Sequence, residues 1–189
     1  MAVRPGREAV AAGLRFKVYS TDLFYFTNCS YLSKIQYFHI EKINQPIFSK
    51  MKITIQRLND AVHMEAKNED GVTLQMDGTG AIGGINGGFR PMQMLLAAAG
   101  GCSAIDIVGI LIKQRQNPDD MAIEVTGERV EVDQYSEFKS IHLHYIFTGH
   151  LDAGKVGRAI ELSLSKYCSV TKTLEKTAKI TSSFEINKP

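Results

Sequence analysis

Residues 90–113 read RPMQMLLAAAGGCSAIDIVGILIK, and this stretch predicts the central element of the fold. Pro91 favours the first turn of an α-helix, because the N–H that proline lacks has no partner at that position. Asp106 is the only residue with a formal charge between Met92 and Ile112. The helix should end before Asn117-Pro118, since a residue that precedes proline is disfavoured in the helical region. The sequence therefore predicts one long and nearly all-apolar helix.

This helix is close in length and hydropathy to a membrane span, which needs about 20 apolar residues. Against that interpretation, the stretch contains three glycines together with Gln93, Ser103 and Asp106. An unpaired aspartate near the middle of a span costs roughly 2.5–3.5 kcal/mol. We interpret the stretch as a buried core helix and expect no membrane partner. Because a small monomer has difficulty covering such a helix on every side, we also expect a homodimer.

The rest of the chain contains short strands and helices without strict β-α-β alternation, which is typical of the α+β class. A glycine-rich loop from Gly78 to Gly88 precedes the long helix. The patterns predict strands at 51–57, 61–67, 72–77, 122–132, 139–148 and 179–186, and further helices at 153–167 and 169–177.

Residues 1–50 differ in composition from residues 51–189. They hold nine of the sixteen aromatic residues, and they carry seven Lys or Arg against three Asp or Glu. We expect residues 51–189 to form one domain and residues 1–50 to be an N-terminal extension. Our leading interpretation is that translation truly starts at Met51. A genuine accessory segment and a targeting peptide are the alternatives, and the second lacks serine enrichment and an apolar secretory core.

The overall composition indicates where the protein works and which partners it lacks. The net charge is +2 and no basic run is present, so nothing indicates a nucleic-acid partner. The three cysteines, Cys29, Cys102 and Cys168, are too few for a disulfide framework. Sparse cysteines are typical of a reducing compartment, where thiols are more often catalytic than structural. We therefore expect a cytoplasmic protein.

Cys102 lies in the middle of the long helix, among alanine and glycine residues. Gly100 and Gly101 each cost the helix roughly 1 kcal/mol relative to alanine. Their presence indicates that another backbone packs closely there, or that a reactant must reach the sulfur. Taken alone, Cys102 is more typical of a structural cysteine, since free cysteine is among the most buried residue types.

Cys168 lies where one predicted helix ends and the next begins, with Ser169 in position to cap the second helix. A sulfur near a helix N-terminus is stabilised as the thiolate, which is the reactive form. Cys102 and Cys168 are thus candidates for an attacking and a resolving thiol. They are 66 positions apart, and that separation alone does not show that they meet.

Two signatures together resemble the OsmC/Ohr family. One consists of Pro91, the alanine-rich run and Cys102, and the other is Tyr167-Cys168-Ser169-Val170 followed by a helix that contains Leu174. The resemblance covers residues 51–186, and the strings PMQM and AAGGCSAID are most similar to its YhfA-like branch. It implies an intertwined homodimer in which β-sheets pack around long central helices.

The resemblance also implies roles for the two cysteines. In the peroxidase members of the family, the cysteine that matches Cys102 attacks the peroxide, and the one that matches Cys168 resolves the sulfenic acid as a disulfide. Catalysis would then need no cofactor and no metal. The partners would be a hydroperoxide substrate and a dithiol reductant such as a lipoyl group.

The chain departs from the hydroperoxide reductases of the family at the residues that activate the thiol. Those proteins carry a glutamate directly after the proline, paired with an arginine that lowers the pKa of the reactive thiol. Met92 occupies the glutamate position here. In the region that corresponds to the arginine, residues 61–71, Lys67 is the only cation. The thiols are therefore present without their usual activating pair.

Asp106, one turn beyond Cys102, also bears on the pKa of the Cys102 thiol. A carboxylate at that distance raises the pKa of a thiol unless a cation neutralises it. Arg90, Arg115 and Arg129 are the candidate compensating cations.

Two further patterns are interpreted as structural. Gly78-Thr79-Gly80-Ala81-Ile82-Gly83 matches the G-x-G-x-x-G of dinucleotide sites, but the glycines continue to Gly88 instead of opening the helix that contacts the pyrophosphate. We interpret it as a flexible loop. His142 and His144 share one face of a predicted strand, yet no third ligand with motif support accompanies them. We interpret both as surface histidines.

Two hypotheses from different classes follow. The first is a cofactor-free thiol peroxidase of the oxidative stress response, which reduces hydroperoxides, organic ones in preference to hydrogen peroxide, through Cys102 and Cys168. The alternative is an OsmC-like protein without peroxidase activity that binds a small apolar or electrophilic ligand at the dimer interface. The two cysteines favour the first hypothesis, and the missing activating pair favours the second.

Overall fold

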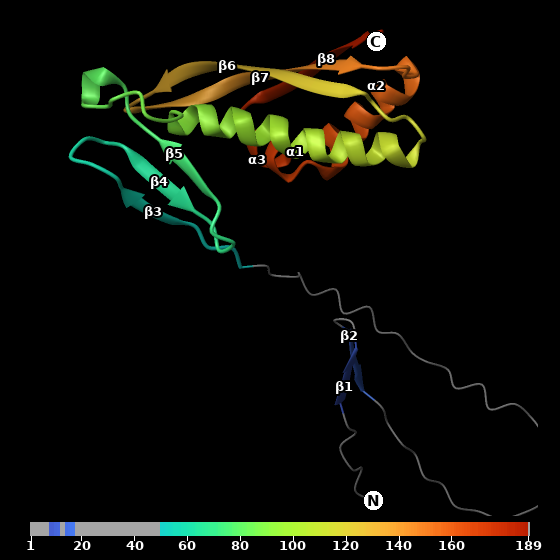
Figure 1. Ribbon diagram of the computed structural model, residues 1–189, viewed down its shortest axis with the longest axis horizontal. Helices are drawn as coiled ribbons and strands as arrows, with labels where there is room; N and C mark the ends of the chain where they lie inside the picture. Colours follow the sequence, from blue (N-terminus) through green and yellow to red (C-terminus); the bar gives the residue numbers. More distant parts are fainter. Residues whose placement is uncertain (1–7, 12–13, 18–49, 189) are drawn as a thin grey trace, which may run out of the picture. The chain divides into compact units, whose positions relative to one another are not determined.

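The computed structural model describes residues 8–11, 14–17 and 50–188 (Figure 1). The chain divides into two units, Met1–Phe48 and Ser49–Pro189. In the first unit, β1 (Glu8–Ala11) and β2 (Leu14–Lys17) form an antiparallel hairpin. No strand was predicted there, because runs of four residues are too short to show a clear alternation. Cys29 lies outside the described residues. That residues 51–189 form an independent domain stays a prediction.

The second unit begins with a three-stranded antiparallel sheet, in the order β3-β4-β5. Each strand is shorter than its predicted run. Several apolar side chains of this sheet are exposed in the single chain, among them Ile55 and Leu74. The strands are β3 (Thr54–Arg57), β4 (Met64–Lys67) and β5 (Thr73–Met76).

A buried carboxylate organises the glycine-rich loop that follows. Asp77 accepts hydrogen bonds from the backbone N–H groups of Gly78, Ile85 and Gly87, at 2.7–2.9 Å. The bond from Gly87 is the largest of the effects that lower the pKa of Asp77. A Cβ atom at Gly84 would lie 2.1 Å from the carbonyl oxygen of Gly78, so only glycine fits there. Asp77 thus occupies three backbone N–H groups of this loop, which includes the short helix η1 (Gly80–Ile82), so these groups are not free to bind a pyrophosphate.

Helix α1 (Pro91–Lys113) is the predicted long helix. The backbone N–H of Arg90 donates to Gln93 Oε1 at its start, and the left-handed backbone of Arg115, at φ 58°, follows its end. By length and composition it is the one helix among the described residues that is long and apolar enough to cross a membrane. Only 28% of an apolar 18-residue stretch of this helix is buried in the single chain. The prediction of a buried core helix therefore holds for one face of α1.

The main sheet has the order β6-β7-β8, with α1 along one face (Figure 1). Strands β6 (Asp120–Val132) and β7 (Tyr135–Thr148) form a long antiparallel hairpin, and β8 (Lys179–Asn187) lies parallel to β7. Strand β7 starts earlier than predicted, because Asp133, at φ 54°, already reverses the chain. Four side chains of β7 build the fully buried face of the sheet: Ile141, Leu143, Tyr145 and Phe147.

The crossover from β7 to β8 is helical but not continuous. Helix α2 (Ala153–Leu162) begins at Asp152, whose side chain accepts from the N–H of Lys155 at 2.8 Å. A single helix was predicted for residues 153–167, but its last turn, η2 (Ser163–Tyr167), is a wider π-helical turn. Helix α3 (Ser169–Leu174) follows directly. Mixed helices and sheets confirm the α+β class.

The outer face of the main sheet is polar. His142 Nδ1 lies 2.8 Å from Thr181 Oγ1, and His142 Nε2 and His144 Nδ1 each lie 2.8 Å from Ser183 Oγ. Both histidines thus share one face, as predicted. Their hydrogen-bond partners are hydroxyl groups on the neighbouring strand β8, and His144 Nε2 also lies 4.0 Å from Glu185 Oε2 of that strand.

The inner face carries a buried hydrogen-bonded tyrosine whose loss should be measurable. The Tyr145 hydroxyl donates to Ser103 Oγ at 2.9 Å, and Ser103 Oγ donates to the carbonyl of Gly100. Burial raises the pKa of Tyr145 to about 12, although the bond to Ser103 opposes the shift. The unfolded tyrosine ionises near pH 10. Its contribution to stability is therefore complete below pH 10 and is lost as the pH rises to about 12.

We predict that Tyr145→Phe lowers the free energy of unfolding by about 1 kcal/mol at neutral pH, because Ser103 loses a buried partner. The variant should also lose less stability than the wild type between pH 10 and pH 12. Denaturant unfolding across pH measures both effects. Tyr135→Phe, at an exposed tyrosine, is the matched control and should match the wild type. Equal stability of Tyr145→Phe and the wild type throughout would contradict the prediction.

Candidate functional site

Cys102 lies in the middle of α1 and is half-buried. A Cβ atom at Gly100 would lie 3.0 Å from Val125 Cγ2, so this glycine lets the helix approach β6 closely. At Gly101, no described atom outside the adjacent residues and the backbone of α1 itself lies within 4 Å of that position. The predicted close packing therefore applies to Gly100, whereas Gly101 contacts no other element of the single chain.

Cys168 is placed by the π-helical turn. Its N–H donates to the carbonyl oxygen of Ser163, five residues earlier, at 2.8 Å. The residue itself is extended, at φ −69° and ψ 98°, and forms the N-cap position of α3. Ser169, which we expected to cap this helix, is instead its first residue. The side chain of Cys168 is fully buried.

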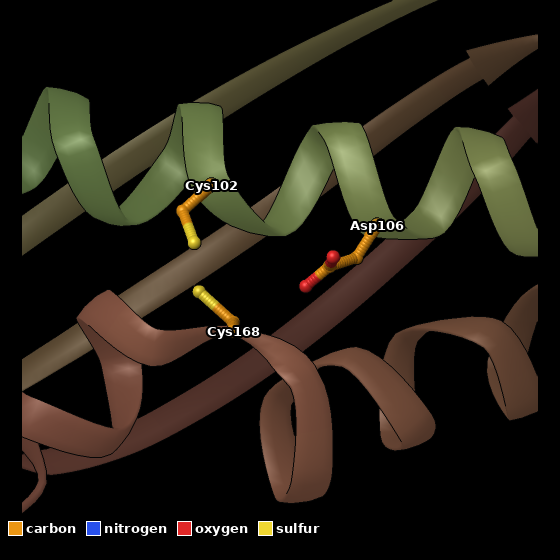
Figure 2. Close-up of side chains that lie close together, drawn as sticks. All are labelled: Cys102, Asp106 and Cys168. Atoms are coloured by element: carbon orange, nitrogen blue, oxygen red, sulfur yellow. The ribbon is translucent and has the colours of Figure 1, made fainter. Parts of the chain in front are cut away.

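The two cysteines meet although they come from distant parts of the chain. Figure 2 shows their side chains pointing toward one another, with the Asp106 carboxylate on the same side of α1. One ligand atom of each of the three residues lies within 4.8 Å of the other two. Both cysteines are free thiols. A disulfide bond of about 2 Å therefore requires only a local movement of the side chains.

Burial controls the protonation of Cys168. Burial raises the pKa of this thiol most, and the hydrogen bond to Cys102 and the negative charge of Cys102 raise it further. Hydrogen bonds from the hydroxyl and N–H of Thr171 act in the opposite direction. The prediction that the N-terminus of α3 would favour a Cys168 thiolate is therefore wrong. The cost of burying a charge outweighs the hydrogen bonds that a Cys168 thiolate accepts from Thr171 at the start of α3.

Asp106 is held by a serine from the π-helical turn. Ser163 Oγ lies 3.2 Å from Asp106 Oδ2 and 3.5 Å from the carbonyl of Ser103. Tyr145 joins this network through Ser103, whose Oγ accepts a hydrogen bond from the Tyr145 hydroxyl at 2.9 Å. The cluster of Cys102, Asp106 and Cys168 is thus supported by hydroxyl groups that link α1 to η2 and β7.

None of the three candidate arginines compensates Asp106 in the described part of the chain. Arg90 is hydrogen-bonded to the carbonyls of Asp77 and Gly88 and to the Asn86 side chain. Arg115 and Arg129 form no ion pair with a described acidic residue. Among the described residues, none of these three arginines therefore serves as the cation that the family resemblance led us to seek.

The sequence model of the OsmC-like protein family matches residues 83–183, which include both cysteines and the π-helical turn. The chain belongs to the OsmC family. Protein YhfA of Escherichia coli K12 is 50% identical to it over 97 residues, which are 51% of this chain and 72% of YhfA. This identity confirms the predicted YhfA-like branch.

Solved structures share the fold of this OsmC family member. A hypothetical protein from Aquifex aeolicus VF5 is 25% identical, with a TM-score of 0.65 over 75% of this chain and 99% of its own. The organic hydroperoxide resistance protein OhrB of Bacillus subtilis has a TM-score of 0.54 at 18% identity, over 72% of this chain and 98% of its own. The second likeness supports the fold alone.

The sequence identified both cysteines and noted Asp106, but it did not identify Ser163 or Tyr145 as parts of the site. Ser163 Oγ reaches Asp106 across 57 positions, and the Tyr145 hydroxyl reaches Ser103 across 42. Neither contact follows a local spacing rule. The π-helical turn had no signal of its own, because the apolar periodicity of α2 continues into it.

We predict that mild peroxide links Cys102 to Cys168 and leaves Cys29 as a free thiol. The facing sulfurs make the disulfide the closest available product of a Cys102 sulfenic acid. Peptide mapping by mass spectrometry under non-reducing conditions measures the linkage. Separate over-oxidation of Cys102 and Cys168, with no linked peptide, would contradict a resolving role for Cys168.

Proposed function

We propose that this chain reduces hydroperoxides, organic ones in preference to hydrogen peroxide, through Cys102 and Cys168. The observation that supports the proposal best is the pair of facing thiols with unequal burial. Cys102 is half-buried, whereas Cys168 is fully buried. A peroxide from solvent therefore meets Cys102 first.

In the first step, the Cys102 thiolate attacks the outer oxygen of the hydroperoxide. A sulfur–oxygen bond forms, the peroxide O–O bond breaks, and the alkoxide that leaves takes up a proton to give the alcohol. Cys102 becomes a sulfenic acid. The raised pKa of Cys168 keeps that thiol protonated and so prevents it from competing as a nucleophile.

In the second step, Cys168 attacks the sulfenic sulfur. The Cys168 thiol loses its proton, the disulfide bond forms, and the sulfenic hydroxyl leaves as water. Asp106, near both sulfurs and oriented by Ser163, is positioned to accept the Cys168 proton. A dithiol, a lipoyl-type group being one example, then returns the pair to two thiols by disulfide exchange and is itself oxidised. No cofactor is required in this cycle, which we place in the cytoplasm and in the oxidative stress response.

We further propose that the protein is an intertwined homodimer. The single chain exposes large apolar side chains on α1, including Ile105 at 77% and Ile112 at 55% of their full exposure. Ile55 and Leu74 of the first sheet add to this uncovered apolar surface. Burial of such surface in a second copy is favourable by about 25 cal/mol per Å².

Light scattering of the full chain should report about twice the 20.9 kDa mass of one chain. Ile105→Glu should shift the equilibrium toward the monomer, because it places a charge on the exposed apolar side of α1. A wild-type protein that is monomeric at micromolar concentrations would contradict the dimer.

The alternative function is binding of a small apolar or electrophilic ligand at the interface between two copies, without peroxidase activity. Two observations favour it. Met92 replaces the glutamate of the hydroperoxide reductases, and Arg90 is engaged in the glycine-rich loop rather than at the cysteines. Turnover distinguishes the two functions.

We predict slow but catalytic consumption of a bulky organic hydroperoxide in the presence of a dithiol. Cys102→Ser should abolish the reaction, because it removes the attacking nucleophile. Cys168→Ser should complete about one turnover and then stop at the sulfenic acid. Hydroperoxide consumption, followed against time for the three proteins, measures this. If the wild type and Cys102→Ser consume hydroperoxide at the same rate, the ligand-binding function replaces the peroxidase.

A further inference from the structure

We propose that Cys102, Asp106 and Cys168 also form a binding site for a thiophilic divalent cation, for which Zn²⁺ is the best-matched ion. Such a site would be occupied only when both cysteines are reduced. Binding of the ion does not depend on the proposed peroxidase activity. The effect of the ion on catalysis, described below, rests on that proposed activity.

The three side chains offer a donor set that suits Zn²⁺. Two sulfurs and one carboxylate oxygen lie within 4.8 Å of one another. Zn²⁺ bonds thiolate sulfur at about 2.3 Å and carboxylate oxygen at about 2.0–2.2 Å, so tetrahedral geometry requires two sulfurs about 3.8 Å apart. The distance between the two sulfurs therefore needs to contract by about 1 Å or less. A fourth position would stay open for water, as in zinc sites with three protein ligands.

The structure already orients these donors without the ion. Cys102 and Asp106 are one turn apart on α1, so they face the same side of the helix. The N–H of Cys168 donates to the Ser163 carbonyl, and this hydrogen bond fixes the backbone of Cys168. The Ser163 hydroxyl holds Asp106 Oδ2 at 3.2 Å, as second-layer partners commonly do for ligating carboxylates.

The local charge also favours a cation. Asp106 has no ion-pair partner among the described residues, and each cysteine becomes negative when it ligates. A divalent cation at the centre of the cluster would pair with Asp106 and with both sulfurs, whereas a soft monovalent ion with two sulfur ligands would leave Asp106 unpaired.

Metal binding and disulfide formation would exclude each other, because both use the same two sulfurs. If the proposed peroxidase activity holds, Zn²⁺ would shield Cys102 from hydroperoxide. Formation of the disulfide would in turn release the ion, since a disulfide sulfur has no thiolate charge to donate.

The test is a Cd²⁺ titration of the reduced Cys29→Ser protein, with Cd²⁺ as a spectroscopic probe for Zn²⁺. Replacement of Cys29 removes the third thiol, so that every sulfur signal comes from the proposed site. We expect an ultraviolet thiolate-to-cadmium charge-transfer band that saturates at one ion per chain. Zn²⁺ should displace the Cd²⁺ and abolish the band. The protein oxidised to the disulfide should show no band.

Variants in the same background test the ligands. Asp106→Asn should weaken Cd²⁺ binding at least tenfold, and Cys168→Ser should weaken it further and reduce the charge-transfer intensity. Asp70→Asn removes a carboxylate from the exposed turn before β5 and should bind as the parent does. Circular dichroism confirms that each variant is folded.

Absence of a saturating band in the reduced parent protein would overturn the inference, as would Asp106→Asn binding as tightly as the parent. Either result would leave the peroxidase proposal intact, because that proposal is measured by hydroperoxide consumption without metal. Conversely, one ion per chain in a protein without turnover would support the metal site and reject the peroxidase.

Discussion

The packing of α1 against the inner face of the main sheet positions everything else in this protein. Ile107 and Leu111 of the helix and Phe147 of β7 are fully buried in one apolar cluster. Burial of a side chain of this size contributes roughly 1.5–3 kcal/mol relative to exposure. This contact fixes the rotation of α1 about its axis. The rotation in turn places Cys102 and Asp106 toward the crossover and leaves Ile105 outside.

The crossover supplies the second half of the site through a departure from regular helix. The π-helical turn η2 follows α2, and in it the N–H of Cys168 donates to the carbonyl oxygen of Ser163, five residues earlier. Single π-helical turns are often found at functional sites, where they re-aim a side chain. Here the turn buries Cys168 against α1 and brings Ser163 to Asp106. The complete burial of Cys168 beside the half-buried Cys102 follows from this turn.

Much of this arrangement follows from local sequence rules. Pro91, the apolar run and the downstream proline predict α1, and alternating residues predict the strands of both sheets. The family signatures identify Cys102 and Cys168. The meeting of the sulfurs could not be predicted, because it depends on how α1 and the crossover pack across 66 positions. The protonation of Cys168 was predicted with the wrong sign, because position at a helix start is visible in sequence whereas complete burial is not.

The central claim is that the two facing thiols act together on one hydroperoxide molecule. The most direct test adds limiting organic hydroperoxide to the reduced Cys29→Ser protein and counts the free thiols that remain. If Cys102 attacks and Cys168 resolves, two thiols should disappear for each hydroperoxide consumed, and a dithiol should restore both. Loss of one thiol per hydroperoxide, or consumption with no thiol loss, would contradict the account.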